Sequence, residues 1–169
     1  MERAQSQPVV WMIAPTFAPA TGGTPVFVRW LSRALLRRGW RVEVVTRRHG
    51  SGLPVDLPAR EEVDGIPVLR ISGYGSGRGK ASSISYALGV LWHLLRQRQP
   101  GIFQALDLGA PAWIAVGARC LLGGRSVLRL CIGSAIYARR MTSRLGRWLV
   151  WAQLRLVDQV VVLNNDLEG

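Results

Sequence analysis

The stretch Pro15-Thr-Phe-Ala-Pro-Ala-Thr-Gly-Gly-Thr-Pro25 separates an apolar run, Val9 to Ala14, from a segment whose apolar residues recur at helical spacing. It places Gly22 and Gly23 at a predicted turn between a strand and a helix. A turn of this kind can bring backbone N–H groups and a helix N-terminus against a phosphate. Most glycine pairs are only tight connections, so the elements that follow decide what this pair means.

The segment after this turn has the signals of a complete helix. Thr24 is the expected N-cap, Pro25 fits the first helical position, and Gly39 supplies the C-terminal stop. The β-branched run from Trp40 to Thr46 then predicts a second, buried strand. Strand, glycine turn, helix and strand together make a right-handed βαβ unit.

The same alternation of strands and helices continues along the chain. The further predicted elements are a turn and strand at 64–71, a helix at 83–99, a strand at 102–106, a helix at 110–122, a strand at 126–132, a helix at 143–157 and a strand at 159–163. This order predicts an α/β fold: a doubly wound, mostly parallel, Rossmann-like sheet flanked by helices, with its ligand edge at the carboxyl ends of the strands. The 169 residues, 49% of them hydrophobic, suffice for one such domain over 1–169.

Composition argues against several classes of protein. No apolar run approaches the roughly 18 to 20 residues of a membrane span. Pro8, Pro15 and Pro19 interrupt the N-terminal apolar stretch, which argues against a signal peptide. Cys120 and Cys131 have neither metal nor redox spacing, so we expect two buried, reduced thiols in a cytosolic protein.

The net charge of +12, with 21 of 22 basic residues arginine, indicates a negatively charged partner. In the predicted helix from Arg139 to Val157, arginines gather on one arc, and Trp148 and Trp151 lie at its edge or within it. The apolar residues expected on the opposite, buried side are Met141, Leu145, Leu149, Ala152 and Leu156.

Arginine and tryptophan on one helix face suit an anionic membrane surface. The membrane-surface candidates are Arg140, Arg144, Arg147, Trp148 and Trp151. A solvated helix face with folded-back tryptophans is the alternative. Nucleic acid is not an expected partner, because no recognition motif is present and aromatic residues do not interleave with the basic ones.

Four segments follow one another along the chain: Gly22-Gly23 after the first strand, Arg38-Gly-Trp-Arg-Val-Glu-Val-Val-Thr46, Asp64-Gly-Ile-Pro-Val68 and Val157-Asp-Gln-Val-Val-Val-Leu163. Together, and over nearly the whole chain, they resemble the N-terminal half of a family 4 glycosyltransferase with the two-Rossmann (GT-B) architecture. The resemblance implies a retaining transfer of sugar from a nucleotide-sugar donor to a lipid-linked or saccharide acceptor. It implies neither a metal nor another cofactor.

In that family the N-terminal half mainly holds the acceptor, and its glycine loop approaches the donor phosphates. The resemblance therefore implies a donor phosphate-binding loop at Gly22, Gly23 and Thr24. Many members act at the cytoplasmic membrane face on lipid-linked acceptors. The expected partners are accordingly a nucleotide sugar, a glycan or glycolipid acceptor, and an anionic membrane surface. The expected location is cytoplasmic, with peripheral binding at the inner face of the cell membrane as a further option.

Two motifs common in the family are missing. Pro100-Gly-Ile-Phe-Gln-Ala-Leu106 stands where a Pro-Asp-x-x-His-x-His run often occurs, and Arg129-Leu-Cys-Ile-Gly133 replaces a strand that often ends in His-Gly. No catalytic residue can therefore be named. Asp107 follows a predicted strand and can face the cleft or cap its own turn, and Arg129 can neutralise a phosphate or lie on the surface. The acceptor-cleft candidates are Asp107, Arg129, Gly133 and Ser134.

The family's donor half is a second Rossmann domain with paired glutamates that hold the nucleotide sugar, and Asn164-Asn-Asp-Leu-Glu-Gly169 precedes no such segment. We therefore expect a half-enzyme, inactive alone, that works with a C-terminal domain in cis or in trans. A dinucleotide oxidoreductase is disfavoured, because G-x-G-x-x-G is missing and Arg47 and Arg48 stand where an acidic residue would follow the second strand. A non-enzymatic basic α/β module that binds a membrane or a protein remains open.

Overall fold

The computed structural model describes residues 9–49, 53, 57–72, 80–130 and 141–162. The strands of this part of the chain are β1 (Val9–Ile13), β2 (Arg41–Arg47), β3 (Arg60–Val63), β4 (Ile66–Ile71), β5 (Gly101–Leu106), β6 (Gly124–Arg129) and β7 (Gln159–Val161). The helices are α1 (Gly23–Arg37), α2 (Lys80–Gln97), α3 (Ala110–Leu122) and α5 (Arg144–Leu156).

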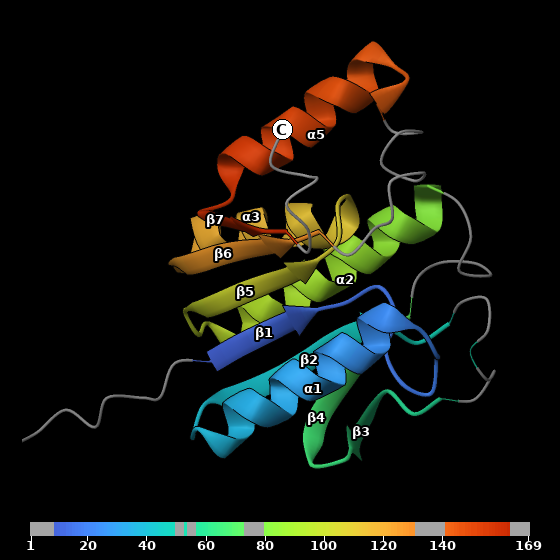
Figure 1. The fold of residues 1–169 in the computed structure, drawn as a ribbon, viewed down its shortest axis with the longest axis vertical. Coiled ribbons are helices and arrows are strands. Elements are labelled where there is room, and N and C mark those ends of the chain that lie inside the picture. Colours follow the sequence, from blue (N-terminus) through green and yellow to red (C-terminus); the bar gives the residue numbers. More distant parts are fainter. Residues whose placement is uncertain (1–8, 50–52, 54–56, 73–79, 131–140, 163–169) are drawn as a thin grey trace, which may run out of the picture.

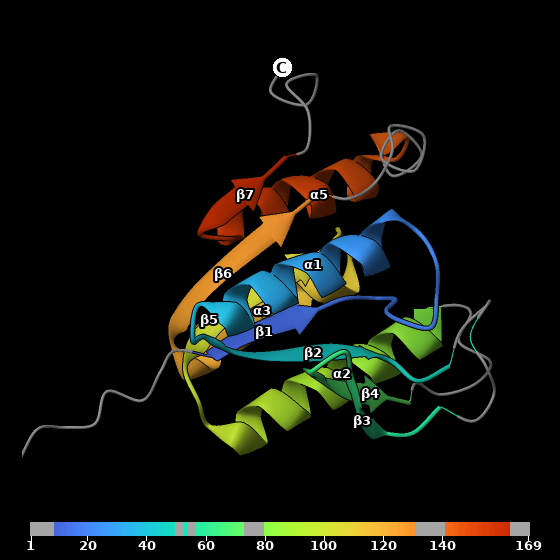
Figure 2. The ribbon, with the colours of Figure 1, turned by 60° about the horizontal axis from the view of Figure 1, so that its bottom comes forward.

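The described strands form one sheet in the order β3-β4-β2-β1-β5-β6-β7. Every neighbouring pair is parallel except β3 and β4. Figure 2 shows the arrowheads of β1, β6 and β7 pointing to the same side. The chain runs from β1 outward to β2 and β4, and then returns to β5 on the other side of β1. This reversal lies between β1 and β5, and doubly wound folds bind their ligands at such a point.

Helices cover both faces of the sheet. Helix α1 lies on one face, and α2 and α3 lie on the other (Figure 1). Alternate residues of β1 enter the two cores: Val10 and Met12 pack on the α1 side, while Trp11 and Ile13 pack with residues of α2, α3 and α5. Because both faces are covered, all of β1 is buried. A strand of this kind has an unbroken apolar run, which is why β1 was predictable.

The predicted fold class is confirmed, and α3 has the predicted bounds. The sequence did not predict β3, a short charged strand that pairs antiparallel with β4. Asp64 and Gly65 join the two strands with φ angles of 55° and 78°. Two successive positive φ angles are typical of a type I′ hairpin, so the Asp-Gly pair marked a complete hairpin and not only a turn before a strand.

The predicted burial of two groups is wrong. Leu145, Leu149 and Leu156 of α5 are 66%, 36% and 45% exposed. Ala152 is buried as expected, and Val150 and Gln153 are buried beside it. Hydrogen bonds from Gln153 fix the rotation of this helix, and apolar periodicity does not reveal them. Cys120 is exposed, because it lies on the outer side of the last turn of α3. Residues 131–140, with Cys131 among them, lie outside the described residues.

Candidate functional site

Helix α1 begins at Gly23, two residues earlier than expected. The segment before it, residues 15–22, is called the glycine turn below. Gly22 is the N-cap, and its carbonyl oxygen accepts a hydrogen bond from the Val26 N–H at 3.3 Å. Thr24 is therefore the second helical residue, and the prediction that it caps the helix is wrong. Gly22 has φ 138° and ψ 174°, a conformation that residues with a side chain rarely adopt. The glycine at this position is thus a conformational requirement of the turn.

The N-terminus of α1 is open. No side chain caps it, and its first turn contains no acidic residue. The backbone N–H groups of Gly23 and Thr24 precede the first intrahelical hydrogen bond, so they point out of the helix end. A Cβ atom added at Gly23 would meet nothing within 4 Å. The turn therefore offers two N–H donors and the positive end of a helix dipole, the combination that favours a phosphate.

A buried arginine holds this turn in place. Arg70 lies in β4, and its Nε donates a hydrogen bond of 2.7 Å to the carboxylate of Glu61 in β3. Its Nη2 group also bonds to that carboxylate and to the carbonyl oxygen of Ala18 in the glycine turn. The β3–β4 hairpin thereby fixes the turn before α1. Sequence analysis missed Arg70, although an arginine inside the apolar run of Ile66–Ile71 was a possible signal.

Arg129 reaches the same helix from the other side of the switch point. Its guanidinium carbon lies 3.2 Å from the ring centroid of Phe27, just over one turn after Gly22. The Arg129 Nε atom is buried and has no hydrogen-bond partner among the described residues. The structure thus brings this candidate to Phe27, in the first turns of α1. Stacking on Phe27 holds the guanidinium flat and leaves its charge unpaired by any carboxylate of the described chain.

Asp107 follows β5 at the same edge of the sheet. Its φ is 109°, and its Oδ1 atom accepts a hydrogen bond of 2.8 Å from the N–H of Leu108. Asp107 thus stabilises its own turn. This was one of the two roles that the sequence left open, and the other was to face the cleft. The N-cap of α3 is Gly109 and not Asp107. The remaining acceptor-side candidates, Gly133 and Ser134, lie outside the described residues, and Arg140 does as well.

Gln153 ties α5 to this edge. Its Oε1 accepts a hydrogen bond of 3.1 Å from the N–H of Gly109, and its Nε2 donates one of 3.0 Å to the carbonyl oxygen of the same residue. A pocket of about 420 Å³ adjoins this contact and is lined by the first turns of three helices, with Ser83 in α2, Ala110 in α3 and Gly146 in α5. Gln153 could not be recognised from the sequence, because its partner is a backbone group 44 residues away.

The proposed membrane helix exposes its aromatic residues. Trp148 and Trp151 are 58% and 56% exposed, and Arg144 and Arg147 are exposed on the same helix. The guanidinium carbon of Arg155 lies 5.3 Å from the ring centroid of Trp151. The tryptophans therefore are not folded into the core. Within the described residues, no three His, Cys, Asp or Glu side chains are close enough to bind a metal ion.

Comparison with known proteins gives a family and a fold. Residues 22–168 match the family model described as "Glycosyl transferase 4-like domain". Curated proteins give no match. Among solved structures, the chain is similar to sucrose-phosphate synthase from Thermosynechococcus elongatus, with a TM-score of 0.72 at 16% identity over 96% of this chain and 44% of that chain.

A second similar structure, from E. coli, is described as trehalose-6-phosphate bound with UDP-2-fluoro glucose. Its TM-score is 0.58 at 14% identity, over 94% of this chain and 40% of that chain. At these identities the likeness shows the fold alone. The chain spans less than half of the length of both of these structures.

Proposed function

Because the chain belongs to the family of glycosyl transferase 4-like domains, we propose that it is the acceptor-side half of a retaining glycosyltransferase. The donor is a nucleotide sugar, and the acceptor is a saccharide or a lipid-linked acceptor. The observation that carries this proposal is the uncapped N-terminus of α1, with Arg129 stacked beside it at the carboxyl edge of the sheet. The nucleotide-sugar analogue in the related E. coli structure supports the choice of donor.

In the proposed reaction the chain stabilises a leaving group. The bond between the sugar and the nucleoside diphosphate breaks as the acceptor hydroxyl oxygen bonds to the sugar on the same face, and the hydroxyl proton passes to the departing diphosphate. Negative charge then develops on the departing phosphate. The N–H groups of Gly23 and Thr24, the dipole of α1 and the charge of Arg129 are fixed donors and charges that favour this product without a metal ion. A C-terminal domain, in cis or in trans, supplies the donor-binding wall of the cleft.

The proposed place of reaction is the cytoplasmic face of a membrane. The exposed surface of α5 combines Arg144 and Arg147 with Trp148 and Trp151, and the helix contains no acidic residue. Such a surface binds anionic headgroups while indole rings rest at the interface. No helix among the described residues is both long and apolar enough to span a bilayer. The proposed association is a peripheral contact made by the exposed surface of α5.

Substitution of Gly23 tests the phosphate-binding role. In the complete enzyme, with its donor domain, Gly23→Val should lower kcat at least about tenfold, because its side chain occupies the space in front of the N–H donors. Thermal unfolding should change little, since a Cβ at Gly23 meets no neighbour. Ala81→Val, a similar addition at the exposed start of α2, is the matched control. Equal turnover of wild type and Gly23→Val would show that the glycine turn does not bind the donor phosphate.

The alternative function is a non-enzymatic basic module that binds a membrane or a protein. It is favoured by one observation: α1, α2, α3 and α5 contain no aspartate or glutamate. This module would bind its partner equally well with and without the donor domain, and no sugar would be transferred in either case.

A further inference from the structure

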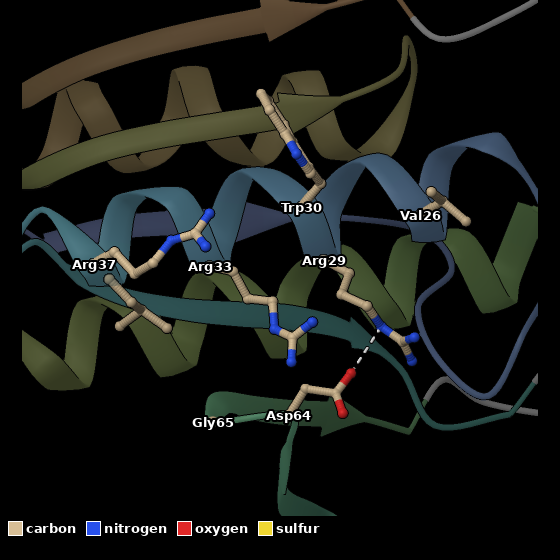
Figure 3. A pocket seen from close by; sticks show the side chains of 8 residues that line it. Val26, Arg29, Trp30, Arg33, Arg37, Asp64 and Gly65 are labelled. Atoms are coloured by element: carbon tan, nitrogen blue, oxygen red, sulfur yellow. Dashed lines mark ion pairs between the residues drawn. The ribbon is translucent and has the colours of Figure 1, made fainter.

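A row of arginines follows the outer side of α1, on the face of the sheet opposite to α5. Arg29, Arg33 and Arg37 recur every four residues, which places them about 6 Å apart along the helix. Arg29 forms an ion pair of 3.1 Å with Asp64. No ion pair joins Arg33 or Arg37 to a carboxylate within the described chain. Figure 3 shows Arg29 and Arg33 directed toward Asp64.

Apolar side chains accompany the arginines. Trp30 is 63% exposed and Val26 is 66% exposed. Figure 3 shows Trp30 pointing away from Asp64, so the indole and the Arg33 guanidinium flank the outer surface of the helix on two sides. An exposed indole offers a flat apolar surface with one N–H donor. Apolar ring faces and anionic groups can therefore be bound together here.

This surface is hollowed and reaches the glycine turn. A groove of about 860 Å³ is lined by the arginine row, Trp30 and the Asp64-Gly65 turn. A smaller pocket of about 170 Å³ lies at the glycine turn, and both cavities are lined by Val26 and Arg29. The two cavities thus adjoin along α1, a helix about 22 Å long. A volume of this size holds several rings and not only a single phosphate.

We propose that the groove along α1 binds an elongated, anionic saccharide acceptor. Carboxylates or phosphates of the saccharide pair with Arg33 and Arg37, and one of its sugar rings packs on Trp30. The end of the saccharide that receives the new sugar lies at the glycine turn. This inference rests on the proposed function and names the class of its acceptor. Charge-assisted hydrogen bonds from guanidinium to carboxylate or phosphate supply affinity, and the row of arginines selects a chain with repeated charges.

The position of the groove favours a saccharide over a lipid surface. Helix α5 packs into the core on the side of the sheet opposite to α1. A flat bilayer in contact with the outer surface of α5 therefore leaves the outer surface of α1 free for a soluble chain. The groove also contains Asp64, which is paired with Arg29 and whose carboxylate can accept hydrogen bonds from sugar hydroxyls.

Titration of the 169-residue chain with oligosaccharides tests this site without requiring a donor. The probes are a hexamer of galacturonic acid and, as the uncharged control, maltohexaose, measured by calorimetry at low and moderate salt. We expect the charged hexamer to bind and maltohexaose not to bind measurably. Arg33→Glu with Arg37→Glu should weaken binding at least about tenfold, and Trp30→Ala should weaken it severalfold.

The control variant is Arg96→Glu with Arg98→Glu, which makes the same change of net charge on exposed residues of the α2 end. Its affinity for the charged hexamer should equal that of the wild type. Equal weakening in both double variants would show nonspecific attraction, and absence of binding would remove the groove as an acceptor site. Binding of phosphatidylglycerol vesicles through Arg33 and Arg37, with no binding of the hexamer, would assign the surface to lipid. Sugar transfer by the complete enzyme is measured separately, so failure of the groove and failure of the proposed function give different results.

Discussion

At the scale of residues, the glycine turn depends on contacts that are distant in sequence. Gly22 and Gly23 were recognisable from the sequence because a glycine pair between a strand and a helix is a local pattern. Arg70 and Gln153 were not, because each acts on a backbone carbonyl or N–H group in another part of the chain. A buried polar side chain with a backbone partner leaves no periodic signal in sequence. The residues that shape the site were therefore harder to predict than the loop itself.

Asp158 lies directly before β7 and makes a pH-dependent contact with Ser126 of β6, at the end of the sheet away from the glycine turn. Its Oδ2 accepts hydrogen bonds from the N–H and the hydroxyl of Ser126 at 2.7 and 2.9 Å, and its Oδ1 lies 2.8 Å from Arg119 Nη2. The backbone N–H of Ser126 is the main cause that lowers the pKa of Asp158 below its ordinary value, with its hydroxyl, Arg119 and Arg125 adding to the effect.

A folded-state pKa below the unfolded one means that the ionised carboxylate stabilises the fold. That contribution is present above the ordinary aspartate pKa of about 4, and it is lost as the pH falls through the lower folded-state pKa. Asp158→Asn should thus reduce the free energy of unfolding at pH 7, and the difference from wild type should shrink toward pH 3. Urea unfolding at pH 7, 5 and 3 measures this. A difference that is constant across the three pH values would contradict it.

At the scale of elements, α3 and β1 were predictable because burial on one or both faces imposes an apolar pattern. Helix α5 was placed correctly along the chain but with the wrong rotation, because Gln153 and Val150 face the core while Leu145 faces solvent. The exposed side consequently carries more apolar surface than the arginine arc suggested. Strand β3 escaped prediction because its residues are charged and its pairing depends on the Asp64-Gly65 turn.

The exposed side of α5 leads to a test of membrane binding. Each arginine near an anionic surface contributes about 1 kcal/mol, so Arg144→Glu with Arg147→Glu should weaken binding to phosphatidylglycerol vesicles at least about thirtyfold. Vesicle co-sedimentation at several salt concentrations measures this affinity. The matched control, Arg33→Glu with Arg37→Glu, makes the same charge change on the opposite side of the sheet and should leave sedimentation unchanged. Equal pelleting with neutral and anionic vesicles would argue against the membrane role of α5.

At the scale of the whole molecule, the alternation of strands and helices was sufficient to predict the doubly wound sheet. The match of residues 22–168 to a glycosyl transferase 4-like domain confirms the predicted family. The proposed class of acceptor could not be predicted from the sequence, because it is inferred from a groove that α1 and the Asp64-Gly65 turn line together. Such a groove requires the hairpin that the sequence did not reveal.

The sucrose-phosphate synthase chain and the E. coli chain described above are each more than twice as long as this chain, which bears on its isolated activity. A nucleotide sugar held by only one wall of a cleft loses most of its positioning and much of its contact area. We expect calorimetric titration of the 169-residue chain with UDP-glucose or GDP-mannose to give no binding tighter than about 1 mM. Micromolar binding of either nucleotide sugar, or sugar transfer by this chain alone, would show that it does not need a second domain.

The two hydrogen bonds between Gln153 and Gly109 have a consequence for regulation. They connect α5, which carries the exposed Trp148 and Trp151, to the turn before α3 at the carboxyl edge of the sheet. If a ligand on α5 changes the affinity of a ligand beside this turn, thermodynamic linkage requires the second ligand to change the affinity of the first by the same factor. A lipid surface bound to α5 would thus be an effector of the ligand edge as well as an anchor.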